Sequence, residues 1–231
     1  MLKNIANYSF NLSIEKSILD DILYRVRKSR IVYDFGNKEW KYGTEETYLK
    51  DLIEYWLNNY DWKKQEKEIN KFSHYKIEID NIPIHFIYEK GSSENSKPLI
   101  LTHGWPWTFW DYKKIIEPLS HPEKYGGNAS DSFDVIIPSL PGYGFSTPLK
   151  ETGINFWKTS DIWVKLMTNI LGYEKFFAHG GDWGAAVTLQ LGHKYSEIVP
   201  AIHTHMAVPI DFVTNPHPDI SFYSDSEKKW H

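Results

Sequence analysis

Hydrophobic positions in the first sixty residues recur at helical spacing. Between residues 14 and 26 they fall three or four apart with charged or polar residues between them, which predicts an amphipathic helix. A second apolar stripe runs from Tyr48 to Trp56 behind Thr44, and we expect Thr44 to cap that helix. The charged stretch 62–70 predicts a third, shorter helix.

The apolar period then changes to that of strands. Residues 75–79 and 82–88 alternate apolar and polar around Asp80-Asn81, which predicts an antiparallel hairpin. Further on, short apolar runs alternate with helical patterns, as parallel β-α-β units do. The expected strands are 98–102, 133–138, 175–178 and 198–204, and the expected helices are 109–119, 160–171 and one that ends near Gly192. The fold class is therefore α/β.

Composition removes several classes of function. Lysine and arginine number 26 against 30 aspartates and glutamates, a net charge of −4, so we expect no nucleic-acid binding that depends on a basic domain. The chain has no cysteine, which excludes disulfides and thiolate metal sites. No apolar run approaches the roughly 18 residues of a membrane span, and the first residues lack a secretory apolar region. We therefore expect a cytoplasmic protein without a membrane span.

Three glycine-rich segments follow predicted strands, at residues 103–106, 141–145 and 180–184. Ligands gather at the carboxyl ends of strands in such sheets. The third segment has the spacing of a nucleophile elbow, with Asp182 at its centre and Gly180 and Gly184 around it. The backbone amide of Trp183 would then face a developing oxyanion. An aspartate that only caps the following helix explains the same local pattern.

Nucleotide binding is a weaker interpretation of these glycine-rich segments. No segment satisfies G-x-G-x-x-G, because Thr147 stands where the Gly142-x-Gly144 pair would need a third glycine. No Gly-Lys-Ser/Thr follows a glycine loop either. By contrast, the loop His103-Gly104-Trp105-Pro106 favours a hydrolase, because a second amide from this position completes the oxyanion hole of α/β-hydrolases.

Together these segments resemble a known family. HGWP at 103–106, LPGYGFS at 140–146 and HGGDWG at 179–184, with the stretch 62–72 that leads into the 82–88 strand, are similar to the epoxide hydrolases of the α/β-hydrolase fold, in particular the microsomal and juvenile-hormone branch. The resemblance runs from about residue 14 to 208. It implies an N-terminal meander and hairpin at 1–90, the first half of an α/β-hydrolase core at 91–207, and the start of a cap region at 208–231.

The resemblance also implies roles for the motif residues. Asp182 would attack an epoxide carbon and form a covalent ester, which water would hydrolyse to release a vicinal diol. The oxyanion hole would be the backbone amides of Trp105 and Trp183. The supporting motif residues are His103, Gly104, Pro106, Gly180, Gly181 and Gly184, of which His103 is expected to hold its loop by hydrogen bonds. No cofactor and no metal are implied.

The expected partner is a small apolar epoxide. Aromatic residues cluster at the predicted strand ends, and we expect Trp107, Tyr143 and Phe145 to line an apolar substrate pocket beside Trp105 and Trp183. Most of the chain's many aromatic residues are expected in its core. The oligomeric state stays open.

The sequence departs from the family after Asp182. The histidines there are His193, His203, His205, His217 and His231, and none stands in the context of the family's catalytic base. His203-x-His205 lacks a third ligand for a metal. We therefore expect an incomplete hydrolase without the base and its acid, which is alkylated at Asp182, turns over poorly, and pairs through an uncovered apolar face. The alternatives are a haloalkane or fluoroacetate-type dehalogenase and an inactive or binding-only fragment.

Overall fold

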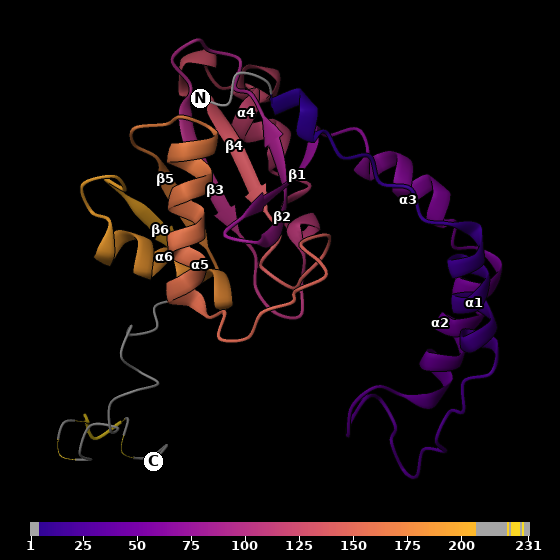
Figure 1. The fold of residues 1–231 in the computed structure, drawn as a ribbon. Helices are drawn as coiled ribbons and strands as arrows, with labels where there is room; N and C mark the ends of the chain where they lie inside the picture. Colours follow the sequence, from indigo (N-terminus) through magenta and orange to yellow (C-terminus); the bar gives the residue numbers. More distant parts are fainter. Residues whose placement is uncertain (1–4, 207–220, 222, 227, 229–231) are drawn as a thin grey trace. The chain divides into compact units, whose positions relative to one another are not determined.

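The computed structural model describes residues 5–206, 221, 223–226 and 228 (Figure 1). The chain forms two compact units. The smaller unit is Asn11–Lys71, and the larger unit combines Met1–Phe10 with Phe72–His231. We describe each unit by itself.

The smaller unit is helical, as the apolar stripes predict. It contains α1 (Lys16–Arg27), α2 (Glu46–Asn58) and α3 (Trp62–Ile69). The expectation that Thr44 caps α2 is wrong, because the N-cap residue is Glu45 and its side chain makes no capping bond. Asp61 does cap α3, by accepting hydrogen bonds from the amides of Lys63 and Lys64.

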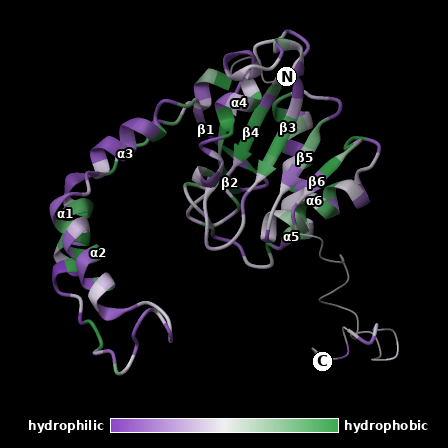
Figure 2. Ribbon diagram, turned by 180° about the vertical axis from the view of Figure 1, so that it is seen from behind, coloured by the Kyte–Doolittle hydropathy of each residue, from purple (hydrophilic) through white to green (hydrophobic). Residues whose placement is uncertain are grey.

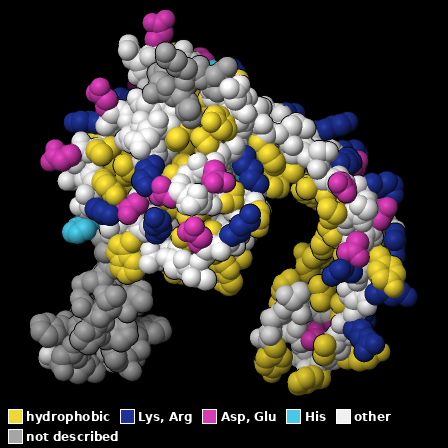
Figure 3. Space-filling view, viewed as in Figure 1, with side chains coloured by type: hydrophobic (Ala, Val, Ile, Leu, Met, Phe, Trp, Pro, Cys, Tyr) yellow, Lys and Arg dark blue, Asp and Glu magenta, His cyan; other side chains and the backbone are white. Residues whose placement is uncertain are grey.

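The two ends of the smaller unit are tied together. The Leu12 amide donates to the Asn70 side chain, and the Ile14 amide donates to Glu66. The Ile14 bond, with that from Lys63, holds the pKa of Glu66 below its usual value. Many hydrophobic side chains of this unit lie on its surface (Figure 3).

The larger unit is built on one sheet of six strands in the order β1-β2-β4-β3-β5-β6. The first three neighbours pair antiparallel, and the pairs from β4 to β6 are parallel. The strands are β1 (His74–Ile79), β2 (Ile82–Glu89), β3 (Lys97–Thr102), β4 (Phe133–Pro138), β5 (Phe177–Gly180) and β6 (Ile202–Thr204). The expected strand at 198–204 is thus much shorter. Figure 2 shows β3 and β4 as hydrophobic along most of their length.

The predicted hairpin is confirmed, and it belongs to the same sheet as the later strands. Asp80 and Asn81 both have positive φ angles, as a two-residue hairpin turn requires. Because β2 pairs with β4, the hairpin is joined to the α/β core. The compact units divide after Phe10 and after Lys71, whereas the expected first boundary was residue 90. Most of the expected cap region, 208–231, lies outside the described residues.

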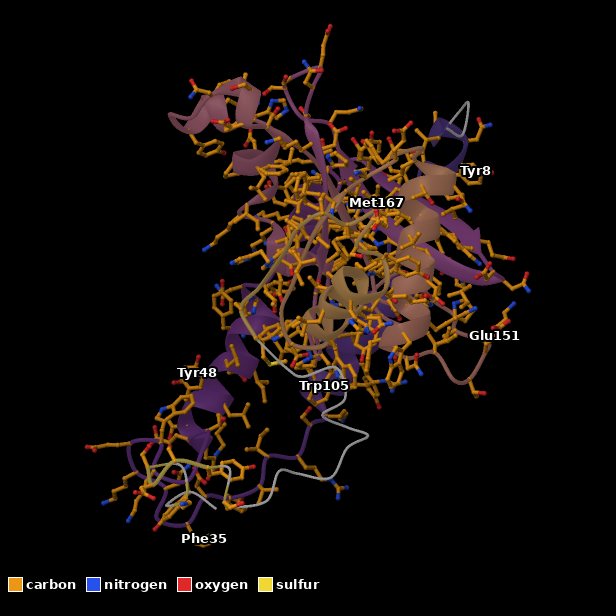
Figure 4. All side chains as sticks on the ribbon, turned by 90° about the vertical axis from the view of Figure 1, so that its left-hand side faces the viewer. Tyr8, Phe35, Tyr48, Trp105, Glu151 and Met167 are labelled. Carbon is orange, nitrogen blue, oxygen red and sulfur yellow. The ribbon has the colours of Figure 1, made fainter. Side chains whose placement is uncertain are left out.

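One face of the sheet is covered by two helices, α5 (Phe156–Lys165) and α6 (Trp183–Lys194). A π-helical turn, Leu166–Ile170, continues α5. Trp163, Met167 and Phe176 are fully buried in the core between these helices and the sheet. Figure 4 labels Met167 among the packed side chains.

The other face carries shorter elements. The expected helix at 109–119 is wrong: the segment forms a 3-10 turn, Phe109–Tyr112, and a separate helix α4, Ile116–Ser120. Pro118 explains the break, because a proline lacks an N–H and is tolerated only in the first turn, where α4 places it. Two further 3-10 turns are Pro122–Tyr125 and Ala129–Asp131, and another, Ile5–Tyr8, packs through Ile5 and Tyr8 against the core cluster that includes Trp163 of α5.

Beside α4, this face leaves an apolar groove of about 490 Å³. Leu99, Leu101 and Phe177 line it, alternating along their strands with residues that point into the core. Ile115 and Ile202 border the groove. Among the described residues, no helix combines the length and the apolar character needed to cross a bilayer.

A buried polar network lies near the start of β4. Tyr173 donates to the carboxylate of Asp134, which also accepts from Lys90 and from the Gly91 amide. Burial, followed by the bond to Asp134, raises the pKa of the Tyr173 hydroxyl. The glycine-rich motifs follow the opposite ends of the parallel strands, so this network stabilises the fold away from them.

Candidate active site

Asp182 lies at a sharp turn between β5 and α6. Its φ of 52° and ψ of −127° are rare for a residue with a side chain. Close packing explains two of the glycines around it. A β carbon on Gly184 would lie 1.9 Å from the Thr102 carbonyl oxygen, and one on Gly180 would lie 2.2 Å from the Gly184 carbonyl oxygen. The glycines therefore let strand and helix meet directly at Asp182.

The Asp182 side chain does not cap α6. Its Oδ1 atom accepts a hydrogen bond of 2.7 Å from the backbone N–H of Trp105. A β carbon on Gly104 would lie 2.5 Å from the β carbon of Asp182. The structure thus brings the first and third glycine-rich motifs into direct contact, and Gly104 makes that approach possible.

His103 is buried, and both of its ring nitrogens are used. Its Nδ1 lies 2.9 Å from the Gly104 carbonyl oxygen, and its Nε2 lies 3.0 Å from the Leu140 amide nitrogen. Burial lowers the pKa of His103, so the ring is neutral at physiological pH. These contacts tie the loop that contains Pro106 to the loop after β4.

The loop after β4 is fixed at both of its ends to His85. Ser139 Oγ lies 2.9 Å from His85 Nδ1, and the His85 amide donates to Ser146 Oγ. His85 also lies 2.9 Å from the ring of His74. Of these residues only Ser146 belongs to a motif noted in the sequence, LPGYGFS, and His74, His85 and Ser139 were missed.

The aromatic residues expected to line a pocket lie in two different environments. The indoles of Trp105, Trp107 and Trp183 are 60%, 59% and 50% exposed. Figure 4 labels Trp105 at the end of the larger unit opposite Tyr8. Phe145 instead packs in an aromatic cluster, and Tyr143 packs on the His103 ring. The other rings of that cluster are Phe10, His85 and Phe109.

Three histidines, His179, His203 and His205, lie close together near the elbow. The His179 and His203 rings stack with 4.9 Å between their centres, and their Nδ1 atoms are 2.8 Å apart. Burial, and then the neighbouring His203, lower the pKa of His179. The His205 ring lies against Gly181, where a β carbon would come within 2.0 Å of it. His205 is thus beside the residue that precedes Asp182, a proximity that sequence reasoning missed.

Asp161 and His193 lie on the helices α5 and α6. Asp161 pairs with Lys194 and accepts from Tyr195, and His193 is exposed on α6. His217 and His231 lie outside the described residues. Among the residues that are described, no group of three or more His, Asp or Glu side chains is arranged to hold a metal ion.

Comparisons with known families agree with this geometry. Residues 7–112 match the family described as epoxide hydrolase N terminus, and residues 97–225 match the family described as alpha/beta hydrolase fold. The solved structure of Aspergillus niger epoxide hydrolase superposes with a TM-score of 0.78 and 27% identity, over 96% of this chain and 57% of that chain.

Relatives in other organisms carry related names. Epoxide hydrolase 1 of Sus scrofa is 35% identical over 203 residues, which are 86% of this chain and 44% of that protein. Juvenile hormone epoxide hydrolase 1 of Ctenocephalides felis is 30% identical in an alignment of 231 positions that covers 96% of this chain and 48% of that protein. The chain thus spans less than half the length of these two relatives.

These matches confirm the resemblance and the fold class that the motifs indicated. The elbow at Asp182, the loop at residues 103–106 and the mostly parallel sheet are arranged as the α/β-hydrolase fold requires. The chain belongs to the α/β-hydrolase fold family, and its residues 7–112 match the family described as epoxide hydrolase N terminus.

Proposed function

We propose that Asp182 is the nucleophile of an epoxide hydrolase. Its free oxygen, Oδ2, attacks one carbon of the epoxide, the bond from that carbon to the ring oxygen breaks, and the resulting alkoxide takes up a proton from water. The product is an ester between Asp182 and the opened substrate. The observation that carries the proposal is the hydrogen bond from Trp105 to Oδ1, because it holds the carboxylate with its other oxygen free to react.

The same contact serves the second step. Water adds to the ester carbonyl carbon, and the negative charge develops on Oδ1, which already accepts from the Trp105 N–H. The Trp183 amide is the second donor that we propose, since it opens α6 and the first N–H groups of a helix have no partner within it. The ester bond then breaks and the vicinal diol leaves.

We infer an apolar epoxide as the substrate. The half-exposed indoles of Trp105, Trp107 and Trp183 support this choice, because they offer apolar contact around a carboxylate without a positively charged partner to select for anions. The relatives named above are epoxide hydrolases, which supports the same class.

The second step also needs a general base, for which we propose neither His103 nor the pair His179 and His203. His103 has both nitrogens engaged, and His179 and His203 bond to each other. We therefore propose that this chain forms the ester faster than it hydrolyses it.

The test is incubation of the 231-residue chain with a reactive aryl epoxide, followed by intact mass measurement and peptide mapping. We expect one adduct per chain, on Asp182, and no adduct in Asp182→Asn. The asparagine variant is a matched control, because its amide oxygen can still accept from Trp105. Rapid diol release without an adduct would overturn the slow second step, and an adduct elsewhere would overturn the assignment of Asp182.

A further inference from the structure

A single peptide group is held from both sides at the candidate active site. The carbonyl of Gly104 and the N–H of Trp105 belong to the same peptide unit. The carbonyl lies 2.9 Å from His103 Nδ1, and the N–H lies 2.7 Å from Asp182 Oδ1. Since a carbonyl can only accept, His103 must donate through Nδ1.

The environment of His103 selects this donor. The Leu140 amide donates to Nε2 over 3.0 Å, so Nε2 cannot carry a proton in the neutral ring. The proton is left on Nδ1, which faces Gly104. The ring is 1% exposed, and water therefore offers no alternative partner for either nitrogen.

We propose that His103 is a positioning residue for the oxyanion hole, which orients the Gly104–Trp105 peptide so that its N–H faces Asp182. This inference rests on the proposed function, because it deepens the role of that amide. A flipped peptide would present its carbonyl to the carboxylate, and the Nδ1 bond opposes the flip. Donation to the carbonyl also polarises the peptide, which strengthens its N–H as a donor.

The hydrogen bonds of His103 connect through Leu140 and Ser139 to the sheet. Leu140 follows Ser139, whose hydroxyl contacts His85 within the buried end of β2. The acceptor bond of His103 is therefore anchored to a part of the fold that does not reach solvent. If His103 only stabilised the fold, its hydrogen bond with Leu140 would be sufficient. To orient the Gly104–Trp105 peptide, it also needs its hydrogen bond to Gly104.

Two substitutions separate these bonds. In His103→Asn the side-chain amide can occupy the place of Nδ1 and donate to Gly104, but it is too short to reach Leu140. In His103→Gln the amide extends toward the place of Nε2 and can accept from Leu140, but it leaves Gly104 without its donor. Tyr173→Phe serves as a control, since it removes a buried hydrogen bond at the opposite end of the sheet.

The first readout is the decay of the isolated Asp182 adduct in alkaline buffer, where hydroxide supplies the nucleophile, followed by intact mass. We expect His103→Gln to slow ester release about 10- to 100-fold, and His103→Asn and Tyr173→Phe to stay within about threefold of the unsubstituted chain. Equal losses in both His103 variants, a loss only in His103→Asn, or no loss in either would overturn the proposal.

The second readout is independent of reactivity and uses nuclear magnetic resonance. We expect the His103 ring of the unsubstituted chain to show a proton on Nδ1, and the Trp105 amide proton to lie far downfield, as a donor to a carboxylate does. The Trp105 signal should move upfield in His103→Gln only. A proton on Nε2 would overturn the inference, whereas failure of the epoxide to react would overturn only the proposed function.

Discussion

The backbone N–H of Trp105 donates to Oδ1 of Asp182 over 2.7 Å, although the two residues are 77 positions apart in the chain. The contact exists because β3 and β5 are parallel neighbours in the sheet. Each strand ends at the same edge, and the loop after β3 therefore meets the turn after β5. The carboxylate at the centre of the elbow is held in place by backbone geometry.

We predict that Asp182 stores conformational strain. A residue other than glycine at φ 52° and ψ −127° costs on the order of 1–3 kcal/mol. Asp182→Gly and Asp182→Ala both remove the carboxylate and its bond from Trp105, but only glycine relieves the strain. Glycine loses more backbone entropy on folding than alanine does, which offsets part of this relief. We expect the measured free energy of unfolding in urea to be higher for Asp182→Gly than for Asp182→Ala by about 1 kcal/mol. Equal stabilities would contradict the strain.

The second prediction concerns pH. Burial, assisted by the nearby His74, lowers the pKa of His85 to about 2, and the unfolded chain returns it to about 6.5. Between these values the unfolded chain binds more protons than the folded chain. The contribution of His85 to stability is therefore complete above about pH 6.5 and falls as the pH falls, by at most about 1.4 kcal/mol per pH unit.

The measurement is the free energy of unfolding in urea between about pH 7 and about pH 5. We expect His85→Gln, which cannot take up a proton there, to lose less stability per pH unit than the unsubstituted chain. His193→Gln is the control, because His193 is exposed on α6. A pH dependence that is the same in His85→Gln and in the unsubstituted chain would show that His85 does not contribute.

The third prediction concerns the apolar groove beside α4. Exposed apolar surface of this kind favours association, and we expect the sedimentation coefficient of the chain to rise with concentration. Ile115 borders the groove and is 39% exposed, so Ile115→Lys should weaken the association. Tyr125, which is 58% exposed and outside the groove, provides the control substitution Tyr125→Lys. A chain that stays monomeric at all concentrations would contradict the prediction.

Local patterns predicted much of the fold. The helical period of the first sixty residues and the alternation around Asp80-Asn81 correspond to the helices and the hairpin observed. The elbow spacing around Asp182 also predicted a strand, a sharp turn and a helix. Each of these features depends on residues close together in the chain, where side-chain period and backbone preference act directly.

Other features could not be read from neighbouring residues. Pro118 divides the helix expected at 109–119, and β6 pairs with β5 over only three residues. Phe145 was expected in a substrate pocket, and it packs on Phe10 and His85, which come from distant parts of the sequence.

The sequence by itself determined the order of the elements, the α/β class and the residues that resemble a hydrolase. Only the tertiary structure decided which of them meet: that Asp182 accepts from Trp105, that His103 holds the same peptide, and that His205 lies against Gly181. The physical reason is that periodicity acts over a few residues, whereas a hydrogen bond between loops depends on the order and register of the strands that carry them.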